Sequence, residues 1–241
     1  MRIVFFGSPA AALPSLRGLI EAGHTVELVV TQPDKPAGRG RKVLPSAVKS
    51  LARERGFPVI EPAKIRTDET ALERVRTAAP DVNVVVAYGQ IIPNAVHSLP
   101  RHRSLNVHFS LLPKYRGAAP VQWTILNGDA ESGVTIIELN DRMDEGDILA
   151  VKRVPVGPRE TARELEDRLA GLGAAKTKVR IVTSPSYTRN IHEVEIRGEF
   201  GTITSKTENV PSATNPKTSR LAVFSAIATL DGITRSIKVG T

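Results

Sequence analysis

The chain contains no cysteine, which excludes disulfide bonds, thiolate catalysis and cysteine-ligated metal sites. It also lacks an apolar run of the length that a transmembrane helix needs. The first residues, 1–6, enter an apolar segment at once, without the charged leader, long apolar core and small-residue cleavage site of a signal peptide. We therefore expect a cytoplasmic protein with no membrane partner.

What is present is an ordinary globular composition with a basic excess. Apolar residues make up 41% and charged residues 24% of 241 residues, so a sizeable core can form. The 33 lysines and arginines against 25 acidic residues give a net charge of +8. This excess favours a polyanionic partner, because cations that neutralise phosphates release condensed counterions. Many basic proteins bind no nucleic acid, so charge alone leaves the partner open.

Apolar strand-like runs alternate with amphipathic segments through the first two-thirds of the chain. Strands are predicted at 2–6, 25–30, 59–60, 82–87, 104–108 and 134–139. Helices are predicted at 10–21, 46–55, 68–78, 121–127 and 161–170, with a short helix after Pro93. This alternation predicts an α/β fold with a doubly wound, mostly parallel sheet. Such sheets bind ligands beyond the carboxyl ends of their strands.

The pattern changes near Gly171-Leu172-Gly173, where the alternation of strands and helices ends. Beyond it the sequence predicts strands at 179–182, 191–196, 201–207 and 237–239 and a helix at 219–230. We therefore expect a first domain at 1–174 and a smaller α+β segment at 175–241.

Three side chains with complementary chemistry follow predicted strands. Asn106 and His108 lie two residues apart on one strand, so they share a face of the sheet. The amide could stabilise an oxyanion and the imidazole could move a proton near neutral pH. Asp144, in an acidic turn, could bring a carboxylate to that imidazole. Together they could catalyse acyl transfer to an amine, although each also fits a purely structural strand end or a solvated turn.

The longer strings around these residues carry a resemblance to a known family. N-V-H-F-S-L-L-P-K-Y-R-G-A-A-P from Asn106 and M-D-E-G-D from Met143 resemble the formyltransferases that use 10-formyltetrahydrofolate, and within them the methionyl-tRNA formyltransferases. Further matching strings are F-G-S-P, V-V-A-Y-G-Q-I-I-P and G-V-T-I, so the resemblance spans about residues 2–173. It implies a Rossmann-like catalytic domain in which Asn106, His108 and Asp144 are catalytic.

The same resemblance implies the substrates. The formyl donor would be 10-formyltetrahydrofolate, without a metal, and the acceptor would be the α-amine of initiator methionyl-tRNA in translation initiation. The residues implied at the folate pocket are Tyr88, Gly89, Gln90, Ile91, Ile92, Ser110, Leu111, Leu112 and Pro113.

Residues 32–42 form a basic segment with four cations among prolines and glycines. Such a segment cannot join a core and could simply be a solvated surface loop. Its place after the second strand resembles the insertion with which methionyl-tRNA formyltransferases reach the tRNA acceptor stem. The resemblance therefore implies that Arg39, Arg41 and Lys42 contact tRNA.

The last quarter of the chain resembles a different family. From about residue 178 it is similar to the carboxyl-terminal part of L-aspartate dehydrogenases, notably in N-I-H-E and in N-P-K-T-S from Asn215. That resemblance implies His192 as a catalytic group with NAD(P) as cofactor. The turn at 7–12 is not G-x-G-x-x-G, so the first domain should not bind NAD in the usual way.

Two families in one chain predict a chimera, whether by natural fusion, engineering or mis-assembly. Three hypotheses follow, in decreasing order of preference. The chain is a formyltransferase, an aspartate dehydrogenase-like oxidoreductase, or a tRNA-binding module without turnover.

Overall fold

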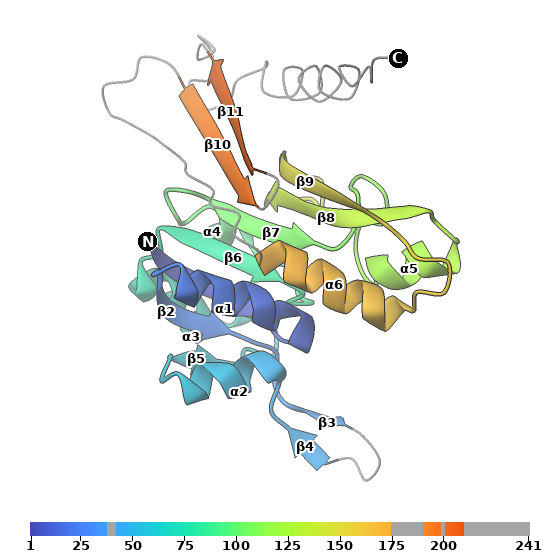
Figure 1. The fold of residues 1–241 in the computed structure, drawn as a ribbon. Helices are drawn as coiled ribbons and strands as arrows, with labels where there is room; N and C mark the ends of the chain where they lie inside the picture. The colour runs from blue at the N-terminus through green and yellow to red at the C-terminus, as the bar shows by residue number, and fades with distance from the viewer. Residues whose placement is uncertain (38–41, 175–189, 199–200, 210–241) are drawn as a thin grey trace, which may run out of the picture. The chain divides into compact units, whose positions relative to one another are not determined.

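A computed structural model describes residues 1–37, 42–174, 190–198 and 201–209 (Figure 1). The chain divides into two compact units, Met1–Ala175 and Lys176–Thr241. The strands expected at 179–182 and 237–239 and the helix expected at 219–230 lie outside the described residues.

The first unit is built on a seven-stranded sheet with the order β5-β2-β1-β6-β7-β8-β9. Its strands are β1 (Arg2–Gly7), β2 (Thr25–Val30), β5 (Val59–Ile60), β6 (Val82–Val86), β7 (Ser104–His108), β8 (Glu131–Glu138) and β9 (Ile148–Pro155). Strands β5, β2, β1, β6 and β7 pair in parallel, whereas β8 and β9 are added antiparallel. The predicted doubly wound, mostly parallel sheet is confirmed.

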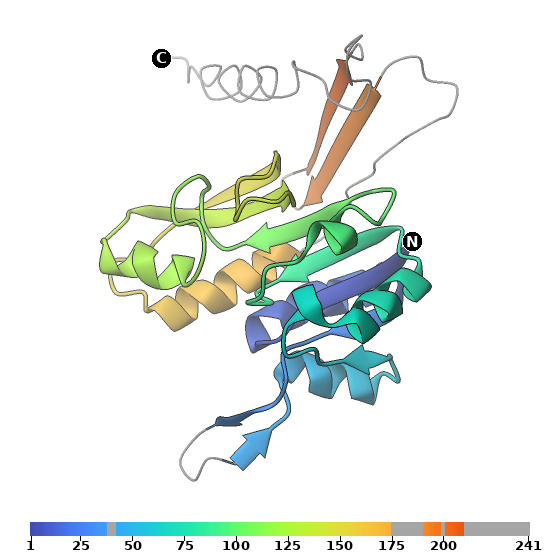
Figure 2. The ribbon, with the colours of Figure 1, turned by 180° about the vertical axis from the view of Figure 1, so that it is seen from behind.

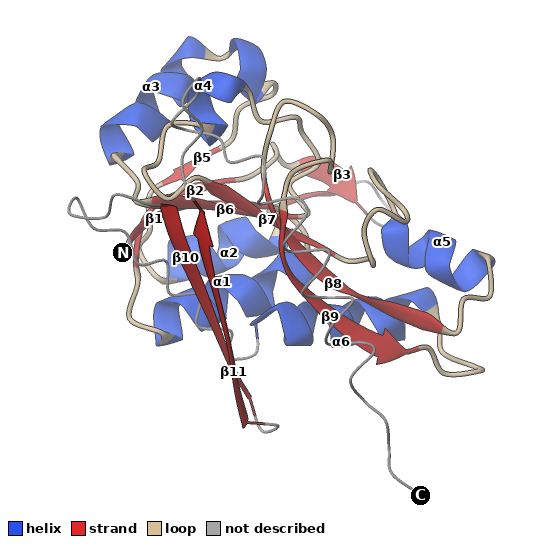
Figure 3. Ribbon diagram, turned by 90° about the horizontal axis from the view of Figure 1, so that it is seen from above, coloured by secondary structure: helices blue, strands red, loops and turns tan. Residues whose placement is uncertain are grey.

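Helices cover both faces of this sheet, as Figure 3 shows. They are η1 (Ala10–Ala12), α1 (Leu13–Glu21), α2 (Ala47–Glu54), η2 (Ile65–Thr67), α3 (Glu69–Ala78), α4 (Asn94–His97), α5 (Pro120–Leu126) and α6 (Ala162–Ala174). Alternate residues of β1 separate two cores. Ile3 and Phe5 pack in one cluster with α1, α2, α5 and α6, and Val4 and Phe6 pack in the other with α3 and α4. A strand buried on both faces explains its continuous apolar sequence.

Side-chain caps begin three of the helices where the sequence predicts. The Ser46 hydroxyl accepts from the Lys49 amide (3.1 Å) and the Asp68 carboxylate from the Ala71 amide (2.9 Å). At α6 the Thr161 hydroxyl accepts from the Glu164 amide, and the Glu164 carboxylate accepts from the Thr161 amide. This reciprocal arrangement is a capping box.

The structure differs from the sequence prediction at three places. Strand β9 was not predicted, and most of its residues are exposed or half-buried, so its sequence lacks a clear apolar alternation. Helix α6 continues through Gly171 to Ala174. The basic segment contains a two-stranded antiparallel ribbon, β3 (Lys35–Ala37) and β4 (Lys42–Leu44), rather than an unpaired loop. Figures 1 and 2 show this ribbon projecting from the body of the unit.

In the second unit, the described residues form an antiparallel hairpin of β10 (Asn190–Gly198) and β11 (Gly201–Asn209). The strands expected at 191–196 and 201–207 are confirmed. His192 lies on β10 opposite Thr207, and its side chain lies outside the description. Across the parts of the chain that the structure describes, no helix is long and apolar enough to span a bilayer.

Candidate active site

A cavity of about 520 Å³ opens at the carboxyl ends of β6 and β7. Asn106 and His108 of β7 both line it, as their spacing on one strand predicts. The residues lining the rest of the cavity come from 85–92, 107–109, 117–122, 139–144 and Glu166. The cavity thus lies where a doubly wound sheet is expected to bind a ligand.

The carboxylate of Asp144 joins the two β7 side chains. Its Oδ1 accepts from the Asn106 amide at 3.1 Å, and its Oδ2 accepts from the Gly117 backbone N–H at 2.8 Å. The same Oδ2 lies 3.6 Å from His108 Nδ1. The Asp144 and His108 side chains are only 12% and 8% exposed, so their charges interact with little screening by water. The structure therefore brings together the three side chains predicted to be catalytic.

A backbone carbonyl fixes the proton position on His108. His108 Nε2 lies 2.8 Å from the carbonyl oxygen of Tyr115. Since a carbonyl oxygen can only accept, Nε2 carries a hydrogen, and in the neutral ring Nδ1 is left with a free lone pair. That lone pair faces Asp144 and the cavity. The neutral imidazole can accept a proton there, and the resulting imidazolium would be paired with the carboxylate.

The segment Ser110–Pro113 does not line this cavity, although the sequence places it at the folate pocket. The Ser110 hydroxyl is fully buried and donates to the Lys114 carbonyl at 2.6 Å. The hydroxyl of Thr135 on β8 donates to the Ser110 carbonyl (2.6 Å) and accepts from the Leu112 amide (3.2 Å). These residues shape the loop behind the site. Thr135 was assigned no role from the sequence, although the residue lies in the matching string G-V-T-I.

The other predicted folate-pocket residues, Tyr88 to Ile92, do line the cavity. The Tyr88 ring packs edge-on against Phe6 in the core, with ring centroids 5.5 Å apart, and burial raises the pKa of its phenol. Gly89 has a φ of +76°, and a Cβ there would lie 2.4 Å from the side-chain amide nitrogen of Gln32. Because the Tyr88 side chain turns into the core, this residue can offer the cavity its backbone.

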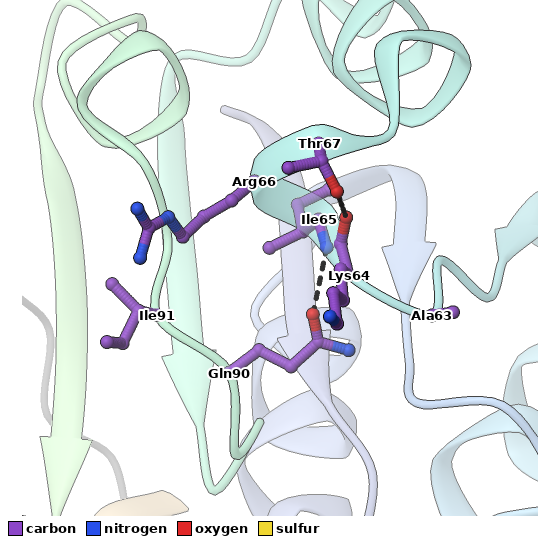
Figure 4. Close-up of a pocket in the computed structure, with 7 residues that line it drawn as sticks. All are labelled: Ala63, Lys64, Ile65, Arg66, Thr67, Gln90 and Ile91. Carbon is purple, nitrogen blue, oxygen red and sulfur yellow. Dashed lines mark hydrogen bonds between the residues drawn. The ribbon is translucent and has the colours of Figure 1, made fainter.

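Gln90 separates this cavity from a neighbouring hollow of about 460 Å³ (Figure 4). Its side-chain oxygen accepts from the Ile65 amide at 2.9 Å, and its nitrogen donates to the Pro62 carbonyl at 3.0 Å. Both ends of this amide are therefore engaged by the backbone around η2. Lys64 and Arg66 also line the hollow and give it a positive character.

The basic ribbon is anchored at its base by a buried lysine. Lys49 is 4% exposed, and its ammonium donates to Asp34 at 2.5 Å and to Glu61 at 2.7 Å. These bonds raise the pKa of Lys49, and the bond from Lys49 lowers the pKa of Asp34. Arg39 and Arg41 lie outside the described residues, and of Lys42 only the backbone is described.

The structure also identifies site residues that the sequence did not single out as functional. Gly117 supplies a backbone donor to Asp144, Tyr115 supplies the carbonyl for His108, and Met143 lines the cavity. Backbone contacts of this kind leave no residue-type signal in a sequence. Among the described residues, no cluster of three or more histidine or acidic side chains is arranged to hold a metal ion.

Comparison with known families divides the chain in two. Residues 1–181 match the formyl transferase family, and residues 166–233 match the carboxyl-terminal region of aspartate dehydrogenase. Both resemblances predicted from the sequence are therefore confirmed.

Curated relatives match 72% of the chain. Methionyl-tRNA formyltransferase of Geobacter sulfurreducens is 49% identical over 174 residues, which cover 72% of this chain and 55% of the relative. Methionyl-tRNA formyltransferase of Methylococcus capsulatus is 52% identical over 174 residues, covering 72% and 56%. The chain thus spans about half the length of the curated relatives it matches.

Solved structures share the fold. Phosphoribosylglycinamide formyltransferase from Bacillus halodurans superposes with a TM-score of 0.59 at 21% identity, over 72% of this chain and 90% of that one. A sugar N-formyltransferase from a Shewanella species gives 0.54 at 19% identity, over 72% and 65%. The family match covers three-quarters of the sequence and includes the whole cavity, so this chain belongs to the formyl transferase family.

Proposed function

We propose that this chain transfers a formyl group from 10-formyltetrahydrofolate to the α-amine of initiator methionyl-tRNA, and that residues 1–174 carry the reaction. The observation that carries the proposal is the convergence of Asn106, His108 and Asp144 on one cavity, with Asp144 bonded to Asn106 and 3.6 Å from His108. The acceptor is proposed from the curated relatives, which are named methionyl-tRNA formyltransferases.

The three side chains divide the chemistry of acyl transfer. The amine nitrogen attacks the formyl carbon, and the carbonyl oxygen of that group becomes an oxyanion. The Asn106 amide, at the cavity wall, donates a hydrogen bond to this oxygen. His108 Nδ1 accepts the proton that the attacking nitrogen loses, with Asp144 stabilising the imidazolium. The same proton passes to the departing folate nitrogen as its bond to carbon breaks, so no proton is gained or lost overall.

The wall formed by Tyr88 to Ile92 suits a flat heterocycle that carries donors and acceptors along its edge. The Gln90 amide is engaged by Pro62 and Ile65, and the Tyr88 ring is in the core. Hydrogen bonds to a pterin would therefore come mainly from backbone groups of this wall. Gly89, with its positive φ, lets the backbone of this wall take a conformation that other residues rarely adopt.

Recognition of tRNA is proposed for the basic ribbon. Arg39, Arg41 and Lys42 would contact the acceptor stem, and the buried Lys49 would hold the base of the ribbon in place. If so, neutralising these three cations weakens tRNA binding and reduces its dependence on salt. Formyl transfer to a small amine would be unaffected by the same changes, since the cavity is lined, among the described residues, by segments outside the ribbon.

A second candidate rests on the match of residues 166–233 to aspartate dehydrogenase. In that case His192 would act in an NAD(P)-dependent oxidation of aspartate. The turn after β1 has no G-x-G-x-x-G spacing to cradle a dinucleotide, which makes this candidate the weaker one. A tRNA-binding module without turnover is the third possibility.

One assay on the purified full chain separates the three candidates. It supplies 10-formyltetrahydrofolate and charged initiator tRNA and measures formyl-methionyl-tRNA, with Asn106→Ala as the matched inactive variant. A parallel sample receives aspartate and NAD(P) and is followed by absorbance, with His192→Ala as its control. We expect formyl transfer that Asn106→Ala abolishes.

The opposite outcomes are equally clear. Absence of transfer together with tight tRNA binding would favour the binding module. Aspartate oxidation that His192→Ala abolishes would favour the dehydrogenase. Formyl transfer by Asn106→Ala at nearly the wild-type rate would overturn the site assignment.

A further inference from the structure

The carbonyl that holds His108 belongs to a residue in an uncommon backbone conformation. Tyr115 has a φ of +58°, in the left-handed region that side chains other than glycine rarely adopt. Its carbonyl oxygen lies 2.8 Å from His108 Nε2. The preceding carbonyl, of Lys114, accepts from the buried Ser110 hydroxyl at 2.6 Å. Such a conformation persists where the surroundings fix it and recurs at functional sites.

Side chains around Tyr115 supply that support. The Tyr115 hydroxyl donates to Asp129 Oδ2 at 2.7 Å and accepts from the Asn127 amide at 2.8 Å. Lys114 Nζ donates to both oxygens of Asp129, at 2.7 and 2.8 Å, and lies 5.0 Å from the centre of the Tyr115 ring. Asn127 and Asp129 follow the end of α5, and the Asp129 amide donates to the Thr124 carbonyl of that helix. We call Lys114, Tyr115, Asn127 and Asp129 the Tyr115 clamp.

None of the four clamp residues lines the cavity. Their direct link to a catalytic side chain is the Tyr115 carbonyl, which lies 2.8 Å from His108 Nε2. Because the hydroxyl of Tyr115 both donates and accepts, the orientation of its ring is fixed, and with it the position of its backbone. The clamp is thus a chain of contacts that runs from the end of α5 to the ring of His108.

We propose that the Tyr115 clamp is a positioning device that holds His108 in the tautomer with hydrogen on Nε2 and a free lone pair on Nδ1. The proposal rests on the proposed function, in which Nδ1 takes the proton of the attacking amine. In the other tautomer Nδ1 carries hydrogen and can donate it to Asp144, 3.6 Å away. The ring would then have no acceptor facing the cavity, and the proton of the amine could not be transferred to it.

The test uses Tyr115→Phe, which keeps the ring and removes the hydroxyl, and Asp129→Asn, which removes the charge. Glu131→Gln is the matched control, because Glu131 is two residues from Asp129 and its side chain pairs with the exposed Arg153. Ring-nitrogen NMR of the full chain, without substrates, reports the tautomer directly. Spectra are taken about two pH units above the ordinary histidine pKa of about 6.5, and the His108 signals are identified by their loss in His108→Gln.

We expect the wild-type chain and Glu131→Gln to show His108 protonated on Nε2 alone. In Tyr115→Phe and Asp129→Asn the signals should shift toward a mixture of the two tautomers. Since general acid–base catalysis contributes about 10²- to 10⁴-fold and the clamp variants weaken it only in part, kcat should fall about tenfold. The KM for the formyl donor should stay within about twofold, because the cavity lining is untouched.

Unchanged tautomers in both clamp variants would overturn the proposal. A lower melting temperature and a higher KM with the Nε2 hydrogen retained would also overturn it, because they indicate a merely structural cluster. If Tyr115→Phe does not fold, Asp129→Asn alone decides, since asparagine has the size and shape of aspartate. The NMR readout needs no turnover. A tautomer shift in a chain that transfers no formyl group would support the clamp and reject the proposed function.

Discussion

The two sides of the cavity are built differently. One side is carried by the loop after β7, which runs from His108 through Gly117 and is held in place by buried hydrogen bonds. Its Ser110 and the Thr135 hydroxyl that supports it are both fully buried. The other side is the turn at 139–147, where the side chains of Asp141 and Arg142 are 73% and 80% exposed. The imidazole is therefore on the well-supported side, and the carboxylate of Asp144 on the exposed side.

The contacts of the acidic turn are mostly at the surface. Asn140 donates to the Glu145 carbonyl at 3.1 Å, and Glu145 pairs with Arg116 at 3.1 Å. Exposed contacts of this kind contribute little and open before the core does. Asp144, through Asn106 and the Gly117 amide, links the turn to the other side with largely buried contacts, whereas the Arg116–Glu145 pair that also spans the two sides is more exposed. Variants can test each half of this contrast.

The largest expected effect comes from removing the Asn106 side-chain amide, which belongs to β7 and is bonded to Asp144 of the exposed turn. Asn106→Ala deletes the proposed oxyanion donor and the 3.1 Å bond to Asp144. One such donor is worth about 100- to 1000-fold in rate, so we expect kcat to fall by that factor. Steady-state kinetics measures this, and equilibrium binding of a folate analogue checks that the cavity remains. A kcat within about threefold of wild type would remove Asn106 from the mechanism.

A smaller but still large effect is expected from Gly146→Ala, which acts on the turn alone. A Cβ at this position would lie 1.6 Å from the Glu138 carbonyl oxygen, so the turn must move away from β8. Asp144 is two residues away, and a misplacement of about 1 Å at a reacting group can cost about 100-fold in rate. We expect a loss of that order in kcat, with the melting temperature nearly unchanged because the turn contributes little to the core.

Gly171→Ala is the matched control for this variant. Gly171 lies in α6 with no atom within 4 Å of a built Cβ, so alanine there should leave kcat unchanged. It should stabilise the helix by up to about 1 kcal/mol. If Gly146→Ala lowered the melting temperature by much more than it lowered activity, the turn would be part of the core and the contrast would be wrong.

The sequence predicted the well-supported side better than the exposed one. Strand β7 was predicted with the bounds that the structure has, because its apolar residues and its Asn-x-His spacing follow the two-residue period of a strand. The capped starts of α2, α3 and α6 were equally clear, since each cap is a local contact. Strand β9 was missed because an exposed edge strand needs no apolar alternation.

Within the site, the residue types predicted the roles of side chains, but they did not predict the hydrogen bonds of backbone groups. Asn106, His108 and Asp144 were identified by their chemistry, and the structure brings them together. Ser110 was expected at the pocket, yet its hydroxyl is engaged with the Lys114 carbonyl behind it. The role of the Tyr115 carbonyl could not be predicted, since it depends on a positive φ that tyrosine does not signal.

A modest effect is expected from the contact between the acidic turn and α4. Asp141 accepts from His97 Nε2 at 3.1 Å and from the Asn94 amide at 3.3 Å, and it also lines the cavity. Asp141→Asn should raise the KM for the formyl donor about two- to fivefold and leave kcat unchanged, because the Asp141 side chain is 73% exposed and Asp144 has its own partners. Donor titrations in steady state measure both constants. A loss in kcat comparable to that of Gly146→Ala would mean that this contact, and not Asp144, holds the turn.

The smallest effect is expected in acid, on the well-supported side. The hydrogen bond from Lys114, and then that from Tyr115, lowers the pKa of Asp129. A carboxyl with a lowered pKa in the folded state stabilises the fold fully above the ordinary aspartate pKa of about 3.9. That contribution is lost as the pH falls through the lowered value. Asp129→Asn should therefore lower the melting temperature slightly at neutral pH and have less effect in acid, below the lowered pKa, where wild-type Asp129 becomes protonated.

Melting curves between about pH 2 and 7 measure this difference, with Glu131→Gln beside it. The control should lie closer to wild type across the range, since the Arg153–Glu131 pair is at 3.6 Å with both side chains more than 60% exposed. If Asp129→Asn had the same effect at both ends of the range, Asp129 would stabilise the loop by packing rather than by charge.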